Sequence, residues 1–393
     1  MNSLRDEVSF MLGDKGGKYY MVSFIVACVV IVLFSQVFSH NHIEDGKIVI
    51  LDMDHSAYSR QLIEKLDASQ YISVEGVLHS TVNPEEILYH DEYLGIIYLP
   101  HGLEARKFQY LPNQIGMFLD NTNLAATANL RTAIMEIITA ENMDIAFPKV
   151  KQLGLSDDQA GGVIANMAVE ERLLFNPEGS YINTMVMGFL NLYSGMFYCF
   201  AVLPIIARLR MENKWHGEIL KGSPFSLMQR ILPYAACFST ALVFGFGVLK
   251  TGFGFRFAGS VVGFLISIVL YTVSTGLLCM IFSWGAKHPG EAIRKMMFVI
   301  VPGFILGGVA LPQALLPNWV AMVSNGFPMV WFFRFVRGVG LRGADLSYMW
   351  RELGGFILYV CILAGILVFR FYQERQKLAR QKEDLPDSCC QAS

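Results

Sequence analysis

The chain alternates between long apolar stretches and polar segments. A helix needs about 20 mostly apolar residues to cross the ~30 Å hydrocarbon core of a bilayer. Six stretches have this length and composition, at about 19–39, 185–207, 231–249, 257–285, 296–316 and 353–371. The pattern therefore predicts a polytopic α-helical membrane protein with six transmembrane helices. The first stretch lacks a small-x-small cleavage site, so we interpret it as an uncleaved anchor and not a signal peptide.

The stretch 296–316 is the most irregular of the six. It is interrupted by Pro302, Gly303, Gly307, Gly308 and Pro312. Such residues are tolerated where neighbouring helices satisfy the freed backbone groups. The following segment, 327–342, sets aromatic side chains beside arginines, which suits a helix lying in the membrane interface. A re-entrant hairpin built from both segments is an alternative that the pattern leaves open.

The polar region 40–182 has the pattern of a small α/β domain. β-rich runs at 47–54, 72–78, 94–100 and 114–120 alternate with helical patterns at 56–69, 83–90, 124–142 and about 156–172. Asp54 or Ser56 is expected to cap the helix 56–69. This alternation favours one layered domain.

Charge is distributed unevenly between the two kinds of region. Residues 40–182 carry 21 acids and 9 bases, a net charge of −12, whereas the rest carries 12 acids and 22 bases, a net charge of +10. The acidic domain lacks the basic patch that nucleic-acid binding requires. We therefore expect no nucleic-acid partner.

The basic residues near the span ends predict the orientation, because cytoplasmic loops carry the excess of Lys and Arg. The side with both termini and the even-numbered loops has 15 bases in its short segments, against six on the other side. This predicts a cytoplasmic segment 1–18, helix 19–39, an outer domain 40–182, a transmembrane domain 183–371 with a cytoplasmic loop 208–227, and a cytoplasmic tail 372–393.

The sequence contains no candidate catalytic centre. The pair Gly17-Lys18 is followed by Tyr19 and has no glycine five residues earlier, so it is no phosphate loop. His40 and His42 match no metal motif. Asp52 and Asp54 follow a strand, and we interpret them as turn and cap residues. We expect no enzyme activity, metal or cofactor in this chain.

Polar residues inside the predicted spans have two interpretations. They join helices or they line a substrate path, and joining is the commoner role. Candidate path residues are Asn191, Ser194, Ser239, Thr272 and Thr275. The span centres lack charges, which argues against an ion-coupled transporter. The pattern suits a conduit that receives its energy from another protein.

The loop after the second span holds an island of charge, RMENKWHGEILKGSP, at 210–224. Its helical pattern begins near Arg208 and stops at Gly222-Ser223-Pro224. Arg208 and Glu212 stand four residues apart, the spacing of an ion pair across one turn. Composition alone also allows a solvated connector whose charges keep the loop out of the membrane.

The chain resembles the permease subunits of ABC exporters of the ABC-2 type, in the branch with a large outer domain after the first span. The resemblance is carried by KIVILDMDHSAYSRQLIEKLDAS, DEYLGIIYLPHGLEARKF, IGMFLDNTNLAATANL, RLLFNPEGSYINTMVMG and FILGGVALPQALLPNW. The charged island is similar to the family's loop "R-E-x-E-x-G-T-x-E-x-L…S-P". It departs from that loop where Glu218, not Thr, follows Gly217, and where Gly222 precedes Ser-Pro.

The resemblance implies a bacterial inner-membrane permease that uses ATP only through a partner subunit. The ATPase-coupling residues implied are Arg208, Glu212, Gly217, Glu218, Leu220, Ser223 and Pro224. The partners implied are a cytoplasmic ABC ATPase, a second permease copy or paralogue, membrane lipid and a periplasmic adaptor of the membrane-fusion type. The alternative from another class is a membrane-anchored envelope scaffold that transports nothing. An adjacent ATPase gene would distinguish the two.

Overall fold

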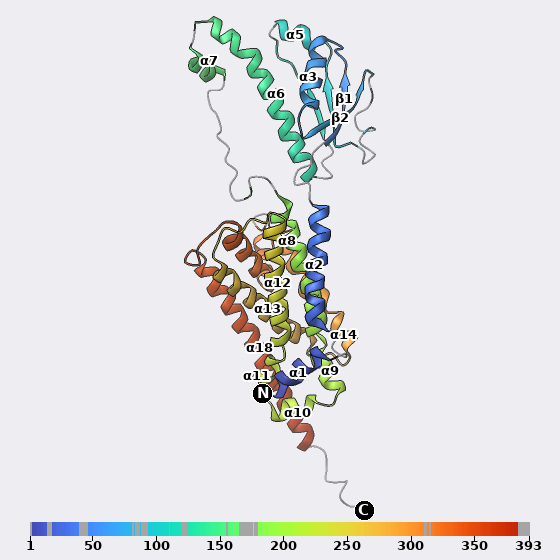
Figure 1. Cartoon of the computed structure of the whole chain (residues 1–393), viewed down its shortest axis with the longest axis vertical. Helices are drawn as coiled ribbons and strands as arrows, with labels where there is room; N and C mark the ends of the chain where they lie inside the picture. The colour runs from blue at the N-terminus through green and yellow to red at the C-terminus, as the bar shows by residue number, and fades with distance from the viewer. Residues whose placement is uncertain are drawn as a thin grey trace, which may run out of the picture. The chain divides into compact units, whose positions relative to one another are not determined.

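The structure is a computed structural model that describes residues 2–13, 18–38, 46–80, 82, 87, 93–109, 111–119, 124–154, 156–164, 176, 180–309, 313 and 316–383. The chain divides into two compact units (Figure 1). The first, which we call the helical unit, comprises 1–39 and 174–393, and the second, the α/β unit, comprises 40–173. Each unit is described by itself.

The α/β unit is built on a four-stranded sheet in the order β2-β1-β3-β4. The strands are β1 Gly46–Asp52, β2 Ile72–Leu78, β3 Gly95–Leu99 and β4 Gly116–Leu119. β1 pairs in parallel with β2 and β3, and β4 pairs antiparallel to β3. Six of the seven β1 residues are buried, as expected for a central parallel strand covered on both faces. All four expected strands are therefore confirmed.

Helices cover one face of this sheet. They are α3 Ala57–Asp67, α5 Leu103–Gln109 and α6 Leu124–Gln152, whereas α7 Asp157–Ile164 packs against α6. Leu62 and Leu66 of α3 pack with Ile48 and Ile50 of β1 in one buried cluster, to which Ile134 of α6 also belongs. Most of the helix expected at 83–90 and the second half of the one expected at 156–172 fall outside the described residues, as do His40 and His42.

Two side chains that follow β1 fix the helix starts. Ser56 is the N-cap of α3 and forms a reciprocal capping box with Ser59. Asp54 caps a different helix: its carboxylate accepts hydrogen bonds from the backbone N–H groups of Gly102, Leu103 and Glu104 at the start of α5, at 2.7–3.0 Å. Ser56 is therefore confirmed as the cap of the helix expected at 56–69. Asp54 is not the cap of that helix, and it joins two segments distant in sequence.

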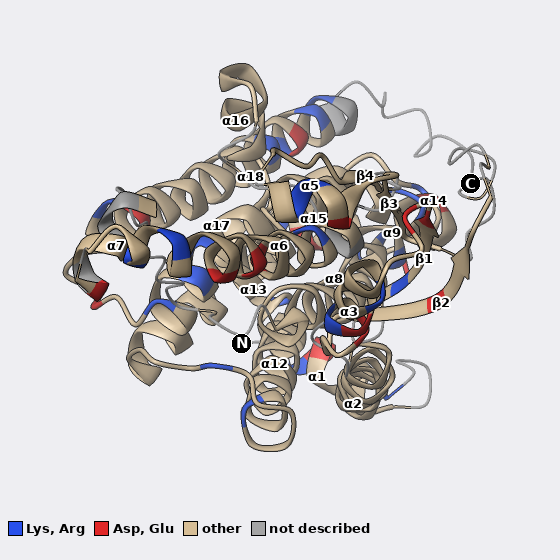
Figure 2. Ribbon diagram, turned by 90° about the horizontal axis from the view of Figure 1, so that it is seen from above, with Lys and Arg blue, Asp and Glu red and all other residues tan. Residues whose placement is uncertain are grey.

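The helical unit is a bundle whose long helices run side by side (Figure 1). Its elements are α1 Asn2–Leu12, α2 Tyr19–Val37, η2 Tyr181–Asn183, α8 Met185–Val202, α9 Pro204–Met211, α10 Trp215–Lys221, α11 Pro224–Gln229, α12 Leu232–Gly252, α13 Val261–Ser283, α14 Pro289–Ile293, α15 Met296–Leu306, α16 Asn318–Ser324, α17 Pro328–Phe335, the π-helix η4 Val336–Leu341 and α18 Trp350–Glu383. The helices α2, α12 and α13 are almost entirely uncharged (Figure 2).

Within the described residues, five segments are long and apolar enough to cross a membrane: Tyr19–Val37, Tyr181–Met211, Pro224–Gly252, Val261–Ser283 and Trp350–Arg380. The sixth span, expected at 296–316, is not found as one helix. α15 has only 11 residues, which gives a length of ~16 Å, about half of the hydrocarbon core. It ends at Leu306, directly before Gly307 and Gly308.

The helices α15 and α17 pack against each other in place of that sixth span. Gly303 approaches Met329, and Gly307 approaches Phe333. The residue numbers of these contacting pairs increase along α15 and α17 together, so the two helices run in the same direction. The chain must therefore turn back between them, and α16 lies on that return. This arrangement agrees better with two half-length helices than with one continuous span.

Aromatic side chains fill the centre of the bundle. Tyr198 of α8 stacks on Phe238 of α12 at 4.7 Å between ring centroids, and Tyr271 of α13 stacks on Phe332 of α17 at 4.7 Å. All four rings are fully buried. Large aromatic surfaces of this kind contribute strongly to packing between helices.

The bundle has two ends that carry different chemistry. We call residues 203–231 and 284–295 the α10 end, because they precede α12 or follow α13. We call residues 253–260 and 336–349 the η4 end: they join α12 to α13 or pack against that junction, as the Ala258 N–H bond to the Gly340 carbonyl shows at 2.8 Å. α1 lies at the α10 end (Figure 1), where it packs against α11 and its Glu7 pairs with Arg208 of α9.

Candidate functional site

The segment between α8 and α12 is folded into three short helices. Asn213 takes up a left-handed conformation with φ 57°, which lets the chain turn from α9 into α10; asparagine tolerates this region well. Trp215 is buried and meets Trp284 edge-on at 5.4 Å. Arg210 donates to the carbonyls of Trp284 and Ala286 at 2.8 and 3.2 Å. The segment is thus anchored to the turn that follows α13.

The turn from α10 into α11 depends on a glycine. A Cβ placed on Gly222 would lie 2.2 Å from the carbonyl oxygen of Glu218, which no side chain can tolerate. The next residue, Ser223, accepts a hydrogen bond from the Ser226 N–H at 3.3 Å and caps α11, with Pro224 as its first residue. The glycine that departs from the typical family pattern is therefore required by this turn.

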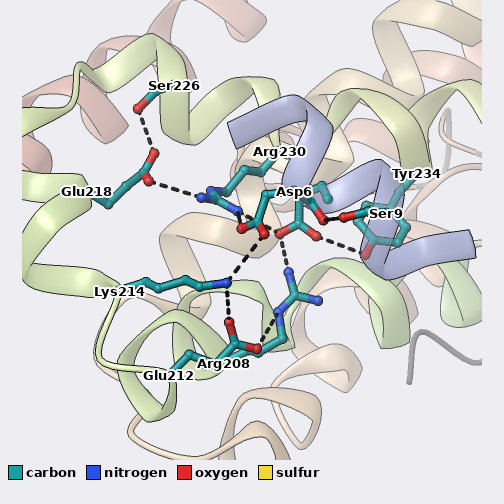
Figure 3. Close-up of polar contacts among 10 residues, drawn as sticks. Asp6, Ser9, Arg208, Glu212, Lys214, Glu218, Ser226, Arg230 and Tyr234 are labelled. Carbon is teal, nitrogen blue, oxygen red and sulfur yellow. Dashed lines mark hydrogen bonds and ion pairs between the residues drawn. The ribbon is translucent and has the colours of Figure 1, made fainter. Parts of the chain in front are cut away.

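A buried ion cluster lies beneath these helices (Figure 3). Glu7 of α1 is fully buried, and its carboxylate accepts hydrogen bonds from Arg208, from Arg230 at 3.3 Å and from the Tyr234 hydroxyl at 3.1 Å. Arg208 also lies over the Phe10 ring at 3.6 Å. A buried carboxylate needs such partners, because an unpaired buried charge costs several kcal/mol.

Arg230 is the hub of the cluster. It is 3% exposed and binds the carboxylates of Asp6 at 3.1 Å, Glu7 at 3.3 Å and Glu218 at 3.0 Å. Glu218 in turn accepts a 2.7 Å hydrogen bond from the Ser226 hydroxyl (Figure 3). One guanidinium therefore connects α1, α10 and the start of α12.

The outer edge of the cluster is more exposed. Lys214 bridges Glu212 at 2.8 Å and Asp6 at 3.4 Å. Burial alone would raise the pKa of Asp6, but Arg230 and Lys214 outweigh it and hold this pKa below its usual value. The hydrogen bond to Glu212 raises the pKa of Lys214. Both groups are thus charged near neutral pH.

The structure separates the coupling residues predicted from sequence into three groups. Arg208 and Glu218 lie inside the cluster, and the predicted pair of Arg208 with Glu212 is present, although at 4.0 Å. Ser223 and Pro224 form the start of α11. Gly217 is exposed with open space around it, and Leu220 is half-buried. Only the last group offers a surface to another protein without first breaking an internal contact.

Four residues of the cluster were not predicted from the sequence: Asp6, Glu7, Arg230 and Tyr234. Two signals were available in the sequence. The segment 2–12 contains an acidic pair in a helix-forming run, and a lone arginine stands directly before the apolar run 231–249. Charges so close to a span need partners.

The candidate path residues lie within the helix packing. Asn191, Ser194, Thr272 and Thr275 are buried. The hydroxyls of Ser239 and Thr272 share a 2.9 Å hydrogen bond between α12 and α13, which is a helix-joining contact. By contrast, the Asn191 side-chain oxygen and the Ser194 and Tyr271 hydroxyls are buried and find no hydrogen-bond partner among the described residues.

The α/β unit brings three potential metal ligands together after β1 and β2. Ligand atoms of Asp52, His55 and His79 lie within 4.8 Å of one another. Both carboxylate oxygens of Asp52 are already used, one by the N–H groups of Asp54 and His55 and the other by the Ser59 hydroxyl at 2.8 Å. Asp52 thus acts as the turn residue expected from sequence.

Comparison with known proteins adds a family to this geometry. A family model described as ABC-2 family transporter protein matches residues 18–370. No curated protein matches the chain. The family match covers both the α10 end and the segments that flank the α/β unit.

Proposed function

The chain belongs to the ABC-2 family of transporter proteins, and from this membership we propose that it is the permease subunit of an ATP-driven export system. It is a multi-pass membrane protein. In the proposed system ATP is bound and hydrolysed by separate ATPase subunits, and the chain itself provides the substrate path.

The α10 segment is the proposed docking site for the ATPase, and its internal anchoring is the observation that carries the proposal. A solvated connector would need no buried partners. Here Glu218 of α10 binds Arg230, which is 3% exposed. A force applied to the exposed face of α10 would therefore reach the bundle without being lost in a flexible loop.

The ion cluster would distribute that force to three spans. Arg230 directly precedes α12, Arg208 lies at the end of the α8–α9 segment, and Glu7 lies in α1, shortly before α2. Arg208 and Arg230 both donate hydrogen bonds to the Glu7 carboxylate. Docking of a partner on α10 would thus act on α2, α8 and α12 together.

The unpaired polar atoms in the bundle support a path between α8 and α13. Buried polar atoms without partners are costly and few in folded proteins. Ser194 and Asn191 lie on one face of α8, three residues apart, and the Tyr271 hydroxyl approaches the next position, Gly195. We propose that these groups meet water or cargo when the bundle opens.

We further propose the bacterial inner membrane as the location, with both termini and the α10 end in the cytoplasm and residues 40–182 in the periplasm. The distribution of basic residues supports this orientation. The proposed partners are two ATPase subunits, a second permease copy or paralogue, and a periplasmic adaptor. Closed pairs are the usual form of such assemblies.

The docking proposal is tested by a substitution on the exposed face of α10. Gly217→Gln adds a side chain where no atom lies within 4 Å, and glutamine favours a helix over glycine by roughly 0.5 kcal/mol. The full-length chain would be purified with its bound proteins from its native host. We expect the variant to retain its fold. Less ATPase should copurify with it than with the wild type, and the purified complex should hydrolyse ATP more slowly.

Gly252→Gln is the matched control. Gly252 also has open space around it but ends α12 at the η4 end, so ATPase recovery should equal that of the wild type. Equal recovery and hydrolysis for Gly217→Gln would contradict docking on α10. A wild-type chain that brings down no ATPase would instead favour the scaffold function.

A further inference from the structure

A polar cavity of about 480 Å³ lies at the η4 end of the helical unit. It is lined by Gly308, Gln313, Arg334, Arg337, Gly338, Arg342, Met349 and Glu352. Three of these side chains are arginines and one is acidic. The α10 end and its ion cluster lie at the other end of α12 and α13, so this cavity is separate from the proposed docking site.

Arg337 is held at the wall of the cavity by backbone and not by a carboxylate. Its guanidinium donates to the Gly307 carbonyl at 2.8 Å. Gly308, with φ 86°, allows this approach: a Cβ there would lie 2.9 Å from a guanidinium nitrogen of Arg337. Arg337 is half-buried, and burial together with Arg342 and Arg334 lowers its pKa to about 10. It therefore remains a cation at neutral pH.

The other two arginines add charge that is only partly balanced. Arg334 donates to the Asn325 side-chain oxygen at 2.7 Å and stacks over Trp331. The Arg342 side chain is exposed and makes no hydrogen bond or ion pair with the described residues, although its backbone N–H donates to the Arg337 carbonyl at 3.0 Å. None of the three arginines forms a salt bridge of 4.0 Å or less with a described carboxylate.

The chain offers few acids that could neutralise this group. The sequence 292–344 contains no aspartate or glutamate, and Glu352 is the one acidic residue among those that line the cavity with the three arginines. Arginines gathered around a cavity without matching acids repel one another. An added anion would remove that repulsion and satisfy their free N–H groups.

We propose that this cavity binds an oxyanion of the phosphate class, held by Arg337 and Arg342, with Arg334 completing the positive wall. The guanidinium group is planar and presents paired N–H donors that match phosphate oxygens. Arg337 uses its hydrogen bond to the Gly307 carbonyl to fix its position, and among the described residues its other N–H donors remain free for the ligand. The oxyanion comes from a membrane lipid headgroup or from solution.

Two probes distinguish these sources in the full-length chain. Phosphatidylglycerol retained by protein from phosphatidylglycerol–phosphatidylcholine nanodiscs would be measured by native mass spectrometry. Inorganic phosphate would be titrated by calorimetry into protein in nanodiscs of phosphatidylcholine alone. Arg342→Gln is the main variant, because within the described residues the Arg342 side chain has no hydrogen bond or ion pair to lose. Arg351→Gln removes an exposed arginine of the same region that does not line the cavity.

We expect Arg342→Gln to weaken, by about tenfold, binding of the probe that the wild type binds, equal to ~1.4 kcal/mol. Arg351→Gln should leave the affinity for that probe unchanged. Arg337→Gln should weaken it at least as much, and if that variant fails to fold then Arg342→Gln decides. Binding of phosphatidylglycerol identifies a lipid headgroup, and binding of phosphate a soluble oxyanion. The proposal is overturned if the wild type binds neither probe, or if Arg351→Gln loses as much affinity as Arg342→Gln.

Discussion

Arg230 and Glu7 lie 3.3 Å apart, N to O, although 223 positions separate them along the chain. Both side chains are almost completely buried. α1 has only 11 residues, too few for a stable helix in isolation. Its position is therefore fixed by this contact and its neighbours, which makes the N-terminal segment part of the α10 end.

Glu7→Gln should release α1. The substitution removes the charge that two arginines share, and breaking a buried ion pair costs about 3–5 kcal/mol. We expect a lower unfolding temperature of the full chain in detergent and faster hydrogen exchange at residues 2–12. Glu212→Gln is the control, because its side chain is 37% exposed and such pairs contribute only about 0–1 kcal/mol. Equal effects of the two variants would contradict a structural role for the buried cluster.

Two glycines of the α10 segment should respond in opposite ways to alanine. At Gly222 a Cβ would meet the Glu218 carbonyl at 2.2 Å, whereas at Gly217 it meets nothing within 4 Å. Gly222→Ala should therefore distort the α10–α11 turn and lower stability by at least ~2 kcal/mol. Gly217→Ala should raise stability by up to ~1 kcal/mol, through helix propensity.

Thermal unfolding of the two variants in one detergent checks this contrast. The loss of stability in Gly222→Ala should be accompanied by faster hydrogen exchange at residues 215–229, because the Glu218–Arg230 contact depends on the turn. A Gly222→Ala variant as stable as wild type would show that the turn relaxes at little cost and that this glycine is not required.

The strands and caps of the α/β unit were predictable because local sequence determines them. Runs such as Ile48–Leu51 are apolar and bounded by turn residues, and the Ser56 cap lies immediately before its helix. The partner of Asp54 was not predictable, since its carboxylate reaches Gly102, 48 positions further on. A cap residue is visible in one sequence, but the helix that it caps depends on the sheet order.

The helical unit shows the same limit on a larger scale. Five apolar stretches are helices long enough to cross a membrane. The stretch 296–316 is as apolar, yet α15 ends at Leu306, because Gly307 and Gly308 let the chain turn where Phe333 and Arg337 approach. Hydropathy shows how apolar a segment is, but it does not show whether the segment forms one continuous helix. The ion cluster was missed for a related reason, since it joins charges from three separate segments.

The buried serines of the spans should differ in their effect on stability. The Ser194 hydroxyl has no hydrogen-bond partner in the part of the chain that the structure describes, whereas the Ser239 hydroxyl bonds that of Thr272 at 2.9 Å. Ser194→Ala should leave stability unchanged or raise it by up to ~1 kcal/mol, because it removes an unsatisfied group. Ser239→Ala should lower it by about 0.6 kcal/mol, a typical value for a hydrogen bond between helices in a membrane.

Unfolding of both variants in the same detergent measures this difference. If Ser194 belongs to the substrate path, its alanine variant should also reduce ATP hydrolysis by the purified complex without loss of stability. A clear destabilisation by Ser194→Ala would instead assign the hydroxyl to helix packing and remove it from the proposed path.

The start of α5 should depend on pH through Asp54. Burial alone would raise the pKa of Asp54, but hydrogen bonds from Ser56 and from the Glu104, Gly102 and Leu103 N–H groups outweigh it and hold this pKa below its ordinary value of 3.8. A carboxyl whose pKa is lower in the folded state stabilises that state above the unfolded pKa, and this stabilisation is lost as the pH falls through the folded value.

Asp54→Asn should therefore destabilise α5 by about 1–2 kcal/mol near neutral pH, since a charged cap is replaced by a neutral one. The difference from wild type should shrink as the pH falls below about 4. Hydrogen exchange of residues 103–109 in the full chain, compared with wild type at each pH, measures it. Asp144→Asn is the control, because that carboxylate is 76% exposed and lies 3.9 Å from Lys65. If the difference in hydrogen exchange between Asp54→Asn and wild type persists unchanged below the folded pKa of Asp54, the cap depends on the shape of the side chain and not on its charge.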